Sequence, residues 1–260
     1  MRESAATAAR HERSGTANDA ATAVSPTQPR NAIVGSGLIA RAFAAQRCAL
    51  NSTCVYAAGV SNSSCGDASE FARERTRLSA ALAATPAAMR FVYFSTCSID
   101  DPWSSGSPYI AHKVAMEALV REHDNHLIVR LPQVAGKTPN PHTLLNYLHA
   151  RICRSERFEL WRGAYRNIID VDDVAAIVAE LIRHEDPRAQ TIAVANPRNC
   201  SIGEIVAAFE RVTCRKAVYD EVDRGGEFII GTDRVAGAIQ RCGIDFGDGY
   251  LLETLAKYYG

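Results

Sequence analysis

The chain has 260 residues, of which 47% are hydrophobic, so it is long enough for one or two domains with a sizeable core. Its 29 basic and 29 acidic side chains give a formal net charge of zero, which provides no overall attraction to nucleic acid or to an anionic membrane. The sequence contains neither a run of eighteen apolar residues nor an apolar signal segment near its start. We therefore expect a cytoplasmic protein that has no nucleic-acid partner and no membrane insertion.

The eight cysteines include no Cys-x-x-Cys pair, and several of them lie within apolar runs. In such runs a cysteine behaves as a small hydrophobic residue. We expect reduced thiols in a reducing compartment, with no disulfide framework and no metal site.

Residues 1–30 are mostly Ala, Ser, Thr and Arg and contain almost no large apolar side chain. Such a segment cannot bury enough surface to offset the entropy of ordering it, so the composition predicts a disordered extension.

From Asn31 onwards, short apolar runs alternate with longer stretches of helical period, which is the pattern of β-α-β units around a parallel sheet. The predicted strands cover residues 31–35, 54–59, 90–96, 127–132 and 191–195. The predicted helices between and after them cover residues 37–46, 69–84, 108–123, 142–154 and 172–184. This order predicts an α/β fold with a doubly wound parallel sheet.

The remaining residues predict a smaller lobe. A capping box, Ser201-Ile-Gly-Glu204, opens a helix that runs to about Val212. A strand near 216–221 and helices near 233–241 and 249–258 follow it. We assign residues 31–135 and 164–196 to the core, and residues 136–163 and 197–260 to the substrate-binding lobe.

A glycine-rich turn, Gly35-Ser-Gly37-Leu-Ile-Ala40, lies directly between the first strand and the first helix. Glycines at such a turn allow the backbone to approach a pyrophosphate, and the helix N-terminus offers free N–H groups to the anion. The alternative is a tight strand-to-helix turn that binds nothing. The position of the turn favours dinucleotide binding.

Two further motifs carry hydroxyl and amino groups. Tyr109 and Lys113 are four residues apart in the helix that begins after Pro108, so both lie on one helix face. A neighbouring ammonium is expected to lower the Tyr109 pKa from about 10 and make the phenol a usable acid/base. Ser95 and Thr96 lie at the carboxyl end of a predicted strand, and ligands bind outside the carboxyl ends of the strands in such folds. Taken singly, each motif also has an ordinary structural explanation, namely a pair on a solvated helix face or hydroxyls that satisfy local backbone groups.

Taken together, the three motifs resemble the short-chain dehydrogenase/reductase superfamily, in particular its extended nucleotide-sugar epimerase/dehydratase type. The likeness continues through Arg130-Leu-Pro-Gln133-Val-Ala-Gly136 and through the stretch from Gly163 to Asp173. It covers nearly everything from residue 31 onwards and implies a Rossmann-like sheet, with NAD or NADP as cofactor.

The resemblance also implies roles for single residues. Thr96, Tyr109 and Lys113 match the catalytic residues. Gln133 and Arg166 match substrate contacts, and the Arg166 guanidinium suits a diphosphate. The implied cofactor contacts are Gly35, Gly37, Leu38, Ile39, Ala40, Ala58, Gly59, Lys113 and Pro132. We expect Asp172 to cap a helix at residues 173–182 and His112 to lie on the helix surface.

The sequence departs from the family pattern at its start. The second strand resembles the family's fourth, and only about seven residues separate it from the first helix, so the family's second and third strands are missing on the adenosine side. The choice between NAD and NADP therefore stays open. We expect the right-handed crossover rule to decide on which face the first helix packs.

The segment between Thr96 and Tyr109 is also short, which removes part of the family's substrate lid. Cys97 and Ser98 follow Thr96 where dehydratases of the family carry an Asp-Glu pair. This difference favours a reductase or an epimerase over a dehydratase.

The sequence therefore predicts an NAD(P)-dependent oxidoreductase or epimerase that transfers hydride at a carbon, commonly C4, of a nucleotide-linked sugar. We expect this reaction to serve the synthesis of surface-polysaccharide precursors. One alternative is an NAD(P)-dependent reductase of a small carbonyl compound. Another is a catalytically silent dinucleotide-binding regulator. Beyond the substrate, the only partner to consider is a second copy of the chain in a homodimer.

Overall fold

The computed structural model describes residues 32–45, 50, 52–104 and 106–260. The extension expected over residues 1–30 lies outside this part of the chain. None of the helices in the described part is long and apolar enough to span a membrane. The cysteines of that part are free thiols.

The main sheet has five parallel strands in the order β1-β2-β3-β4-β8. Their bounds are β1 (Ala32–Val34), β2 (Thr53–Tyr56), β3 (Arg90–Thr96), β4 (His126–Leu131) and β8 (Gln190–Ala193). Every side chain of β2 and β3 is buried, so these central strands are nearly continuous apolar runs rather than alternating ones. The predicted doubly wound parallel sheet is confirmed.

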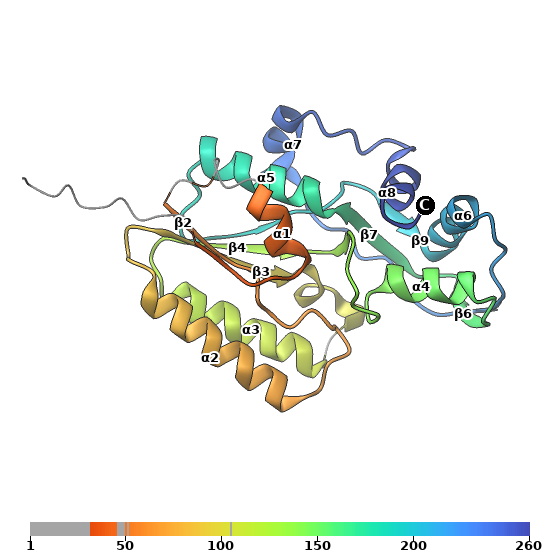
Figure 1. Ribbon diagram of the computed structural model, residues 1–260, viewed down its shortest axis with the longest axis horizontal. Helices are drawn as coiled ribbons and strands as arrows, with labels where there is room; N and C mark the ends of the chain where they lie inside the picture. The colour runs from red at the N-terminus through yellow and green to blue at the C-terminus, as the bar shows by residue number, and fades with distance from the viewer. Residues whose placement is uncertain (1–31, 46–49, 51, 105) are drawn as a thin grey trace, which may run out of the picture.

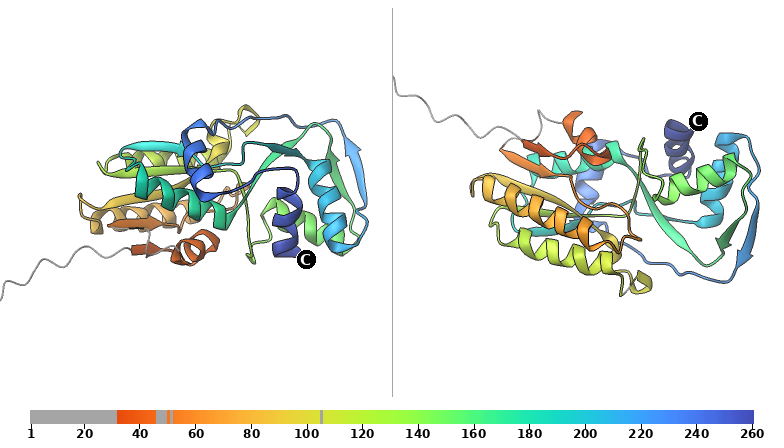
Figure 2. Two further views of the ribbon diagram at one scale, coloured as in Figure 1. Left: turned by 90° about the horizontal axis from the view of Figure 1, so that it is seen from above. Right: turned by 60° about the horizontal axis from the view of Figure 1, so that its bottom comes forward.

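Helices cover both faces of this sheet (Figures 1 and 2). One face carries α2 (Ala68–Ala84) and α3 (Pro108–Arg121), whose Leu78 and Met116 pack on Tyr56 and Tyr93. The other face carries α1 (Leu38–Ala45), α5 (Val171–His184) and α7 (Ala236–Cys242). The sheet is thus the middle of three layers.

The face taken by α1 differs from what the crossover rule requires. Strands β1, β2, β3 and β4 follow one another in one direction across the sheet, all parallel. Helices on opposite faces then give connections of opposite hand, so β1-α1-β2 has the opposite hand to β2-α2-β3 and β3-α3-β4. The expectation that the right-handed rule holds throughout is wrong. The local reason is packing, because Ala42 and Phe43 of α1 join the apolar side chains of α5 in one core.

A second, smaller group of elements packs around its own apolar core. Its helices are α4 (Leu144–Cys153), α6 (Ile202–Thr213) and α8 (Tyr250–Tyr259). Its strands form two small sheets, β5 (Gln133–Ala135) with β7 (Tyr165–Asp170) and β9 (Asn199–Ser201), and β6 (Phe158–Trp161) with β10 (Tyr219–Val222). Strand β7 thus pairs with β5 and β9 rather than with the main sheet. The domain boundaries stay a prediction.

Local sequence explains where several helices begin. The Ser201 hydroxyl accepts the Glu204 N–H while the Glu204 carboxylate accepts the Ser201 N–H, which is the predicted capping box. Helix α5 begins one residue after Asp170, whose side chain accepts the Asp172 N–H. The helix cap is therefore Asp170, and the expectation that Asp172 caps it is wrong.

Candidate active site

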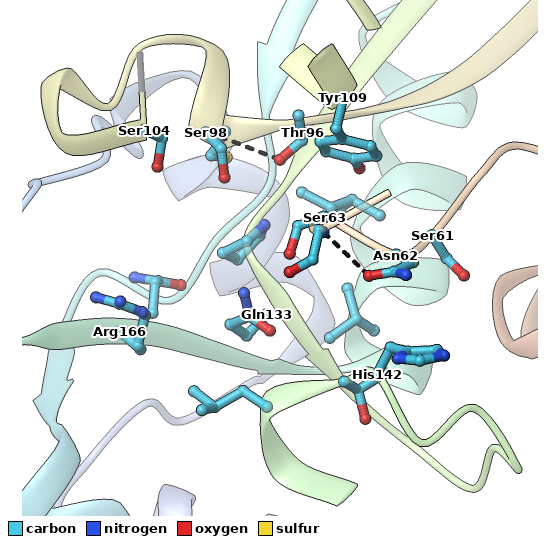
Figure 3. Close-up of a pocket in the computed structure, with 18 of the residues that line it drawn as sticks. Ser61, Asn62, Ser63, Thr96, Ser98, Ser104, Tyr109, Gln133, His142 and Arg166 are labelled. Atoms are coloured by element: carbon cyan, nitrogen blue, oxygen red, sulfur yellow. Dashed lines mark hydrogen bonds between the residues drawn. The ribbon is translucent and has the colours of Figure 1, made fainter. Parts of the chain in front are cut away.

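A cleft of about 780 Å³ lies at the carboxyl ends of the central strands. Its walls come from the turn before α1, the segments after β2 and β3, and the chain around β5 and β7 (Figure 3). This is the size of a small-molecule site and the end of the sheet at which α/β proteins bind ligands. The hydroxyl of Thr96 reaches this cleft, as its position at the end of β3 predicts.

Thr96, Tyr109 and Lys113 come together on one wall of the cleft. Tyr109 is the second residue of α3, which Pro108 opens, and its hydroxyl and that of Thr96 line the same wall. The Thr96 hydroxyl accepts the Ser98 N–H at 3.1 Å, so its position is fixed. Lys113 follows one helical turn after Tyr109, with its Nζ 5.8 Å from the centre of the Tyr109 ring. Two hydroxyls and an ammonium therefore meet where a polar substrate group would lie.

The Lys113 ammonium is buried and already bonded. It donates to Glu74 Oε1 and to the Tyr93 hydroxyl, both at 3.1 Å. Burial lowers the pKa of Lys113, and the neighbouring Glu74 carboxylate opposes that change. An acidic residue of α2 thus holds the lysine that the motif places beside Tyr109.

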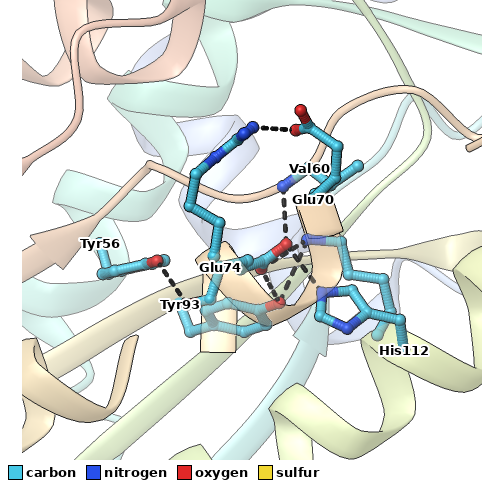
Figure 4. A network of polar contacts seen from close by, with 8 residues as sticks. Tyr56, Val60, Glu70, Glu74, Tyr93 and His112 are labelled. Carbon is cyan, nitrogen blue, oxygen red and sulfur yellow. Dashed lines mark hydrogen bonds and ion pairs between the residues drawn. The ribbon is translucent and has the colours of Figure 1, made fainter. Parts of the chain in front are cut away.

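Glu74 is the centre of a buried polar network (Figure 4). Besides Lys113, its carboxylate accepts the Val60 N–H at 2.6 Å and the Tyr93 hydroxyl at 2.9 Å, and it lies 2.9 Å from His112 Nε2. Burial alone would raise the Glu74 pKa, but the Lys113 ammonium and these donors together hold it below its ordinary value. The carboxylate is therefore ionised at neutral pH.

His112 belongs to this network and does not lie on the helix surface as expected. Its ring is buried, bonded to Glu74, and stacked on Phe71 with 4.4 Å between ring centres. The helical pattern placed it beside Lys113, but sequence alone did not show that α2 covers this face of α3.

The Tyr109 pKa differs from the sequence expectation. Burial raises it above the ordinary value, the Glu74 carboxylate raises it further, and the neighbouring Thr96 hydroxyl opposes both. The expectation that the neighbouring ammonium lowers this pKa is wrong for this structure, first because the phenol is buried and second because Glu74 lies beside Lys113 and offsets its charge.

The glycine-rich turn has the geometry of a phosphate cradle. Gly35 has φ +126°, and a Cβ there would lie 2.4 Å from the Ala57 carbonyl oxygen, so the turn requires glycine. Gly37 precedes α1 and faces open space at the cleft, which Leu38 and Ile39 also line. A helix N-terminus next to open space beside glycine suits the pyrophosphate of a dinucleotide, so the residues present fit that cofactor.

The other residues that the motifs assign to the cofactor divide into two groups. Gly59 and Pro132 line the cleft together with Lys113, whereas Ala40 is buried within α1. Ala58 packs against the core on the α2 side. A Cβ at Gly59 would lie 2.8 Å from both Glu74 Oε1 and Lys113 Nζ. Glycine at that position therefore makes room for the buried ion pair.

Gln133 and Arg166 line the cleft from β5 and β7, and Arg166 lies across the cleft from Tyr109 (Figure 3). Among the described residues, the only hydrogen bond recorded for the Arg166 side chain runs to the Tyr165 carbonyl oxygen at 2.6 Å. Burial lowers the Arg166 pKa and the Asp101 carboxylate opposes this. The guanidinium is thus half-buried at the cleft with most of its donors available.

Cys97 follows Thr96 in the sequence, and burial raises the pKa of its thiol to about 12. It is therefore a thiol rather than a reactive thiolate at neutral pH. Within the described residues no group of three or more His, Cys, Asp or Glu side chains is arranged to hold a metal ion.

A family model described as the NAD dependent epimerase/dehydratase family matches residues 33–195, well over half of the chain. The chain belongs to this NAD-dependent epimerase/dehydratase family. The match begins in β1 and ends just after β8, so it spans nearly the whole main sheet together with α3. No functionally curated protein matches the chain significantly in sequence.

Solved structures similar to this member of the family share its fold at low sequence identity. RMD from Pseudomonas aeruginosa, complexed with NADPH, is 15% identical with a TM-score of 0.66, over 88% of this chain and 99% of that one. MoeE5, in complex with UDP-glucose and NAD, is 17% identical with a TM-score of 0.68, over 87% and 97%. UDP-glucuronic acid 4-epimerase from Bacillus cereus, in complex with UDP-glucuronic acid and NAD, is 15% identical with a TM-score of 0.60, over 80% and 75%.

Sequence reasoning missed Glu74, the residue of this family member that contacts Lys113 most directly. A signal for it exists in the pattern of α2. Phe71, Glu74 and Leu78 follow one another at helical spacing on the face that packs against α3. An acid on the apolar stripe of a helix needs a partner, because an unpaired buried charge is very costly.

Proposed function

We propose that this protein is an NAD(P)-dependent enzyme that transfers hydride at a carbon of a nucleotide-linked sugar. The observation that carries the proposal is the pairing of two features in one cleft. A proton donor, Tyr109, lies on one wall, and a half-buried guanidinium with available donors, Arg166, lies opposite. The first suits oxidation or reduction at a sugar carbon, and the second suits a diphosphate.

The cofactor is held, on this proposal, by the turn around Gly37, by Ile39 and by Lys113. The open space at Gly37 receives the pyrophosphate, and the N-terminus of α1 supplies N–H donors. A bound nicotinamide supplies or accepts the hydride. The solved structures with NAD or NADPH are of the same fold, which supports this choice of cofactor.

The reacting oxygen of the substrate is expected to lie between Thr96 and Tyr109. Thr96 donates a hydrogen bond to it and fixes its position, and Tyr109 gives it a proton or takes one from it. Gln133 contacts the sugar from β5. Synthesis of surface-polysaccharide precursors in the cytoplasm is the role that such a reaction would serve.

The test is a pair of calorimetric titrations, one with UDP or dTDP and one with NAD(P)H. Charge-assisted hydrogen bonds are each worth roughly 1.5–3 kcal/mol, and about 1.4 kcal/mol corresponds to a tenfold change in affinity. Arg166→Ala should weaken nucleoside diphosphate binding by about tenfold or more and leave dinucleotide binding unchanged. Arg166→Lys should recover only part of the loss, because a point charge cannot form the bidentate fork.

Arg162→Ala is the matched control. Arg162 lies between β6 and β7, close to Arg166 in sequence, but its side chain is exposed and paired with Asp223 outside the cleft. This variant should bind both ligands as wild type does. If wild type binds neither UDP nor dTDP, or if Arg166→Ala binds them as tightly as wild type, the nucleotide-sugar assignment fails and a small carbonyl compound becomes the better substrate.

A further inference from the structure

The Glu74 carboxylate and the Lys113 ammonium form an ion pair that is closed to solvent. The exposed fractions of their side chains are 1% and 3%, and Glu74 Oε1 lies 3.1 Å from Lys113 Nζ. Gly59 leaves the space that both head groups occupy. The pair is therefore built into the packing of α2 against α3 and is not a surface contact between flexible side chains.

Other ionisable groups face Tyr109 and Lys113 from each neighbouring element. Strand β3 contributes Tyr93, which hydrogen-bonds to both members of the ion pair, and β2 contributes Tyr56, whose hydroxyl donates to the Glu74 backbone carbonyl. Helix α3 contributes His112, and also Glu117, which faces Lys113 from the next turn. Among the described residues, the basic side chains whose nitrogens lie within 4 Å of the Glu74 carboxylate are Lys113 and His112. The negative charge of Glu74 thus lies directly against the ammonium that would otherwise favour a phenolate at Tyr109.

We propose that Glu74 neutralises the Lys113 ammonium and helps to keep the buried Tyr109 a phenol, so that at neutral pH this enzyme reduces a carbonyl group, with Tyr109 donating the proton, more readily than it oxidises the corresponding alcohol. This inference rests on the proposed function and selects one direction of it. Glu74 touches neither substrate nor cofactor in this assignment, so it is a positioning residue that acts through Lys113.

The step balances as the reduction of a ketone. The carbonyl carbon accepts a hydride, with its electron pair, from a reduced nicotinamide, and the C=O π bond breaks towards oxygen. The oxygen takes the proton of the Tyr109 hydroxyl and becomes an alcohol. Tyr109 is left as a phenolate and recovers a proton from water that enters the cleft. A base for the reverse oxidation would need the phenolate before the substrate binds, and Glu74 disfavours that form.

The protonation state of Tyr109 can be followed without any substrate. Wild type carrying ¹³Cζ-tyrosine is titrated by NMR between pH 6 and the onset of alkaline unfolding, and Tyr109→Phe assigns the resonance. In wild type the Tyr109 signal should not titrate below about pH 10, the ordinary value for a phenol. In Glu74→Gln, which leaves the Lys113 charge uncompensated, it should titrate at least about one pH unit lower than in wild type.

Glu70→Gln is the matched control. Glu70 lies one turn earlier on the same helix, is partly exposed, and pairs with Arg73. Its removal should leave the Tyr109 signal where it is in wild type. An unchanged Tyr109 titration in Glu74→Gln overturns the proposal.

A wild-type Tyr109 that titrates near neutral pH also overturns the proposal, and this result needs no variant to fold. The titration is independent of nucleotide binding. A failure of the nucleotide-sugar assignment therefore shows in the Arg166 experiment alone, and a failure of this inference shows here alone.

Discussion

In the proposed function, Tyr109 is the residue on which the chemistry depends most directly. Tyr109→Phe removes the transferable proton and keeps the ring, so turnover of any substrate that wild type converts should fall by about two orders of magnitude or more. Dinucleotide binding, followed by calorimetry, should stay within about twofold of wild type, since the phenol is not part of the glycine-rich turn. Wild-type turnover in this variant would remove Tyr109 from its assigned role.

Gly59 provides a test of how tightly the Glu74–Lys113 ion pair is packed, with stability as the measured quantity. Gly59→Ala adds a methyl group 2.8 Å from both Glu74 Oε1 and Lys113 Nζ, so the buried ion pair must shift. Overpacking of this kind costs about 1–3 kcal/mol, which urea denaturation can measure. Gly66→Ala meets no atom within 4 Å and should change the free energy of unfolding little. Equal stability of the two variants would show that the pair has room to move.

Single-residue predictions from sequence succeeded where a motif fixes local geometry. The cap at Ser201 needs only residues within one turn, and the structure has it. The role expected for His112 depended on which helix covers α3, and the Tyr109 pKa depended on an acid distant in sequence. Contacts between residues that are distant in sequence cannot be predicted from the local sequence pattern.

Helix α8 is joined to the start of α5 by hydrogen bonds and ion pairs. The Tyr250 hydroxyl donates to Asp173 Oδ2 at 2.6 Å and accepts the Asp170 N–H at 2.8 Å. Lys257 Nζ bridges the Asp170 and Asp172 carboxylates, at 2.8 Å from each. The aspartates at the end of β7 and in the first turn of α5 therefore hold α8 in place.

We expect Tyr250→Phe to destabilise the protein by about 1–3 kcal/mol, because it leaves both a half-buried carboxylate and a backbone N–H without this partner. Thermal or urea unfolding measures the change. Tyr219→Phe keeps the exposed ring that packs on Phe158 and serves as the control, with an expected change close to zero. A Tyr250→Phe protein as stable as wild type would mean that water replaces both bonds.

Sequence predicted the long elements better than the short ones. Every strand of the main sheet begins within one residue of its expected start and ends within three of its expected end. The runs that mark them are fully buried in β2 and β3 and only partly buried in β1 and β8. Strands β5, β6 and β9 were not predicted, since such short strands show no usable period. The longer β7 was also not among the predicted strands. Strands β5 and β6 contribute to the cleft wall, so the structure was needed to place Gln133 in the same cleft as Tyr109.

At the scale of the whole molecule, two buried acids link stability to pH. Burial opposes ionisation of Glu74 and Glu117, but Lys113 in the first case and Arg130 in the second hold both pKa values below the ordinary range. A lowered folded-state pKa stabilises the protein above the unfolded-state value, near ~4.3, and that stability is lost as pH falls through the folded-state value. Asp173, whose pKa burial raises, offsets part of the loss.

We therefore expect the free energy of unfolding to be flat between about pH 6 and about pH 7 with respect to these acids, and to fall by about 2 kcal/mol or more below about pH 4. Urea denaturation at a series of pH values measures this. In Glu117→Gln the free energy of unfolding should fall less steeply with decreasing pH than in wild type, although this variant is less stable at neutral pH. A wild-type stability that does not change down to about pH 3 would contradict the assignment.

The reversed hand of β1-α1-β2 has a consequence for synthesis on the ribosome. Helix α1 contacts Phe94 of β3 through Phe43, but the helix that packs beside it is α5, which the chain reaches only after β4 and the first part of the smaller lobe. Unlike β2-α2-β3-α3, whose elements meet their neighbours as they emerge, the first unit has no helix to pack against while the middle of the chain is being made. We expect β1 and α1 to dock late, when α5 has emerged, so that the glycine-rich turn is completed as one of the last parts of the nascent sheet domain.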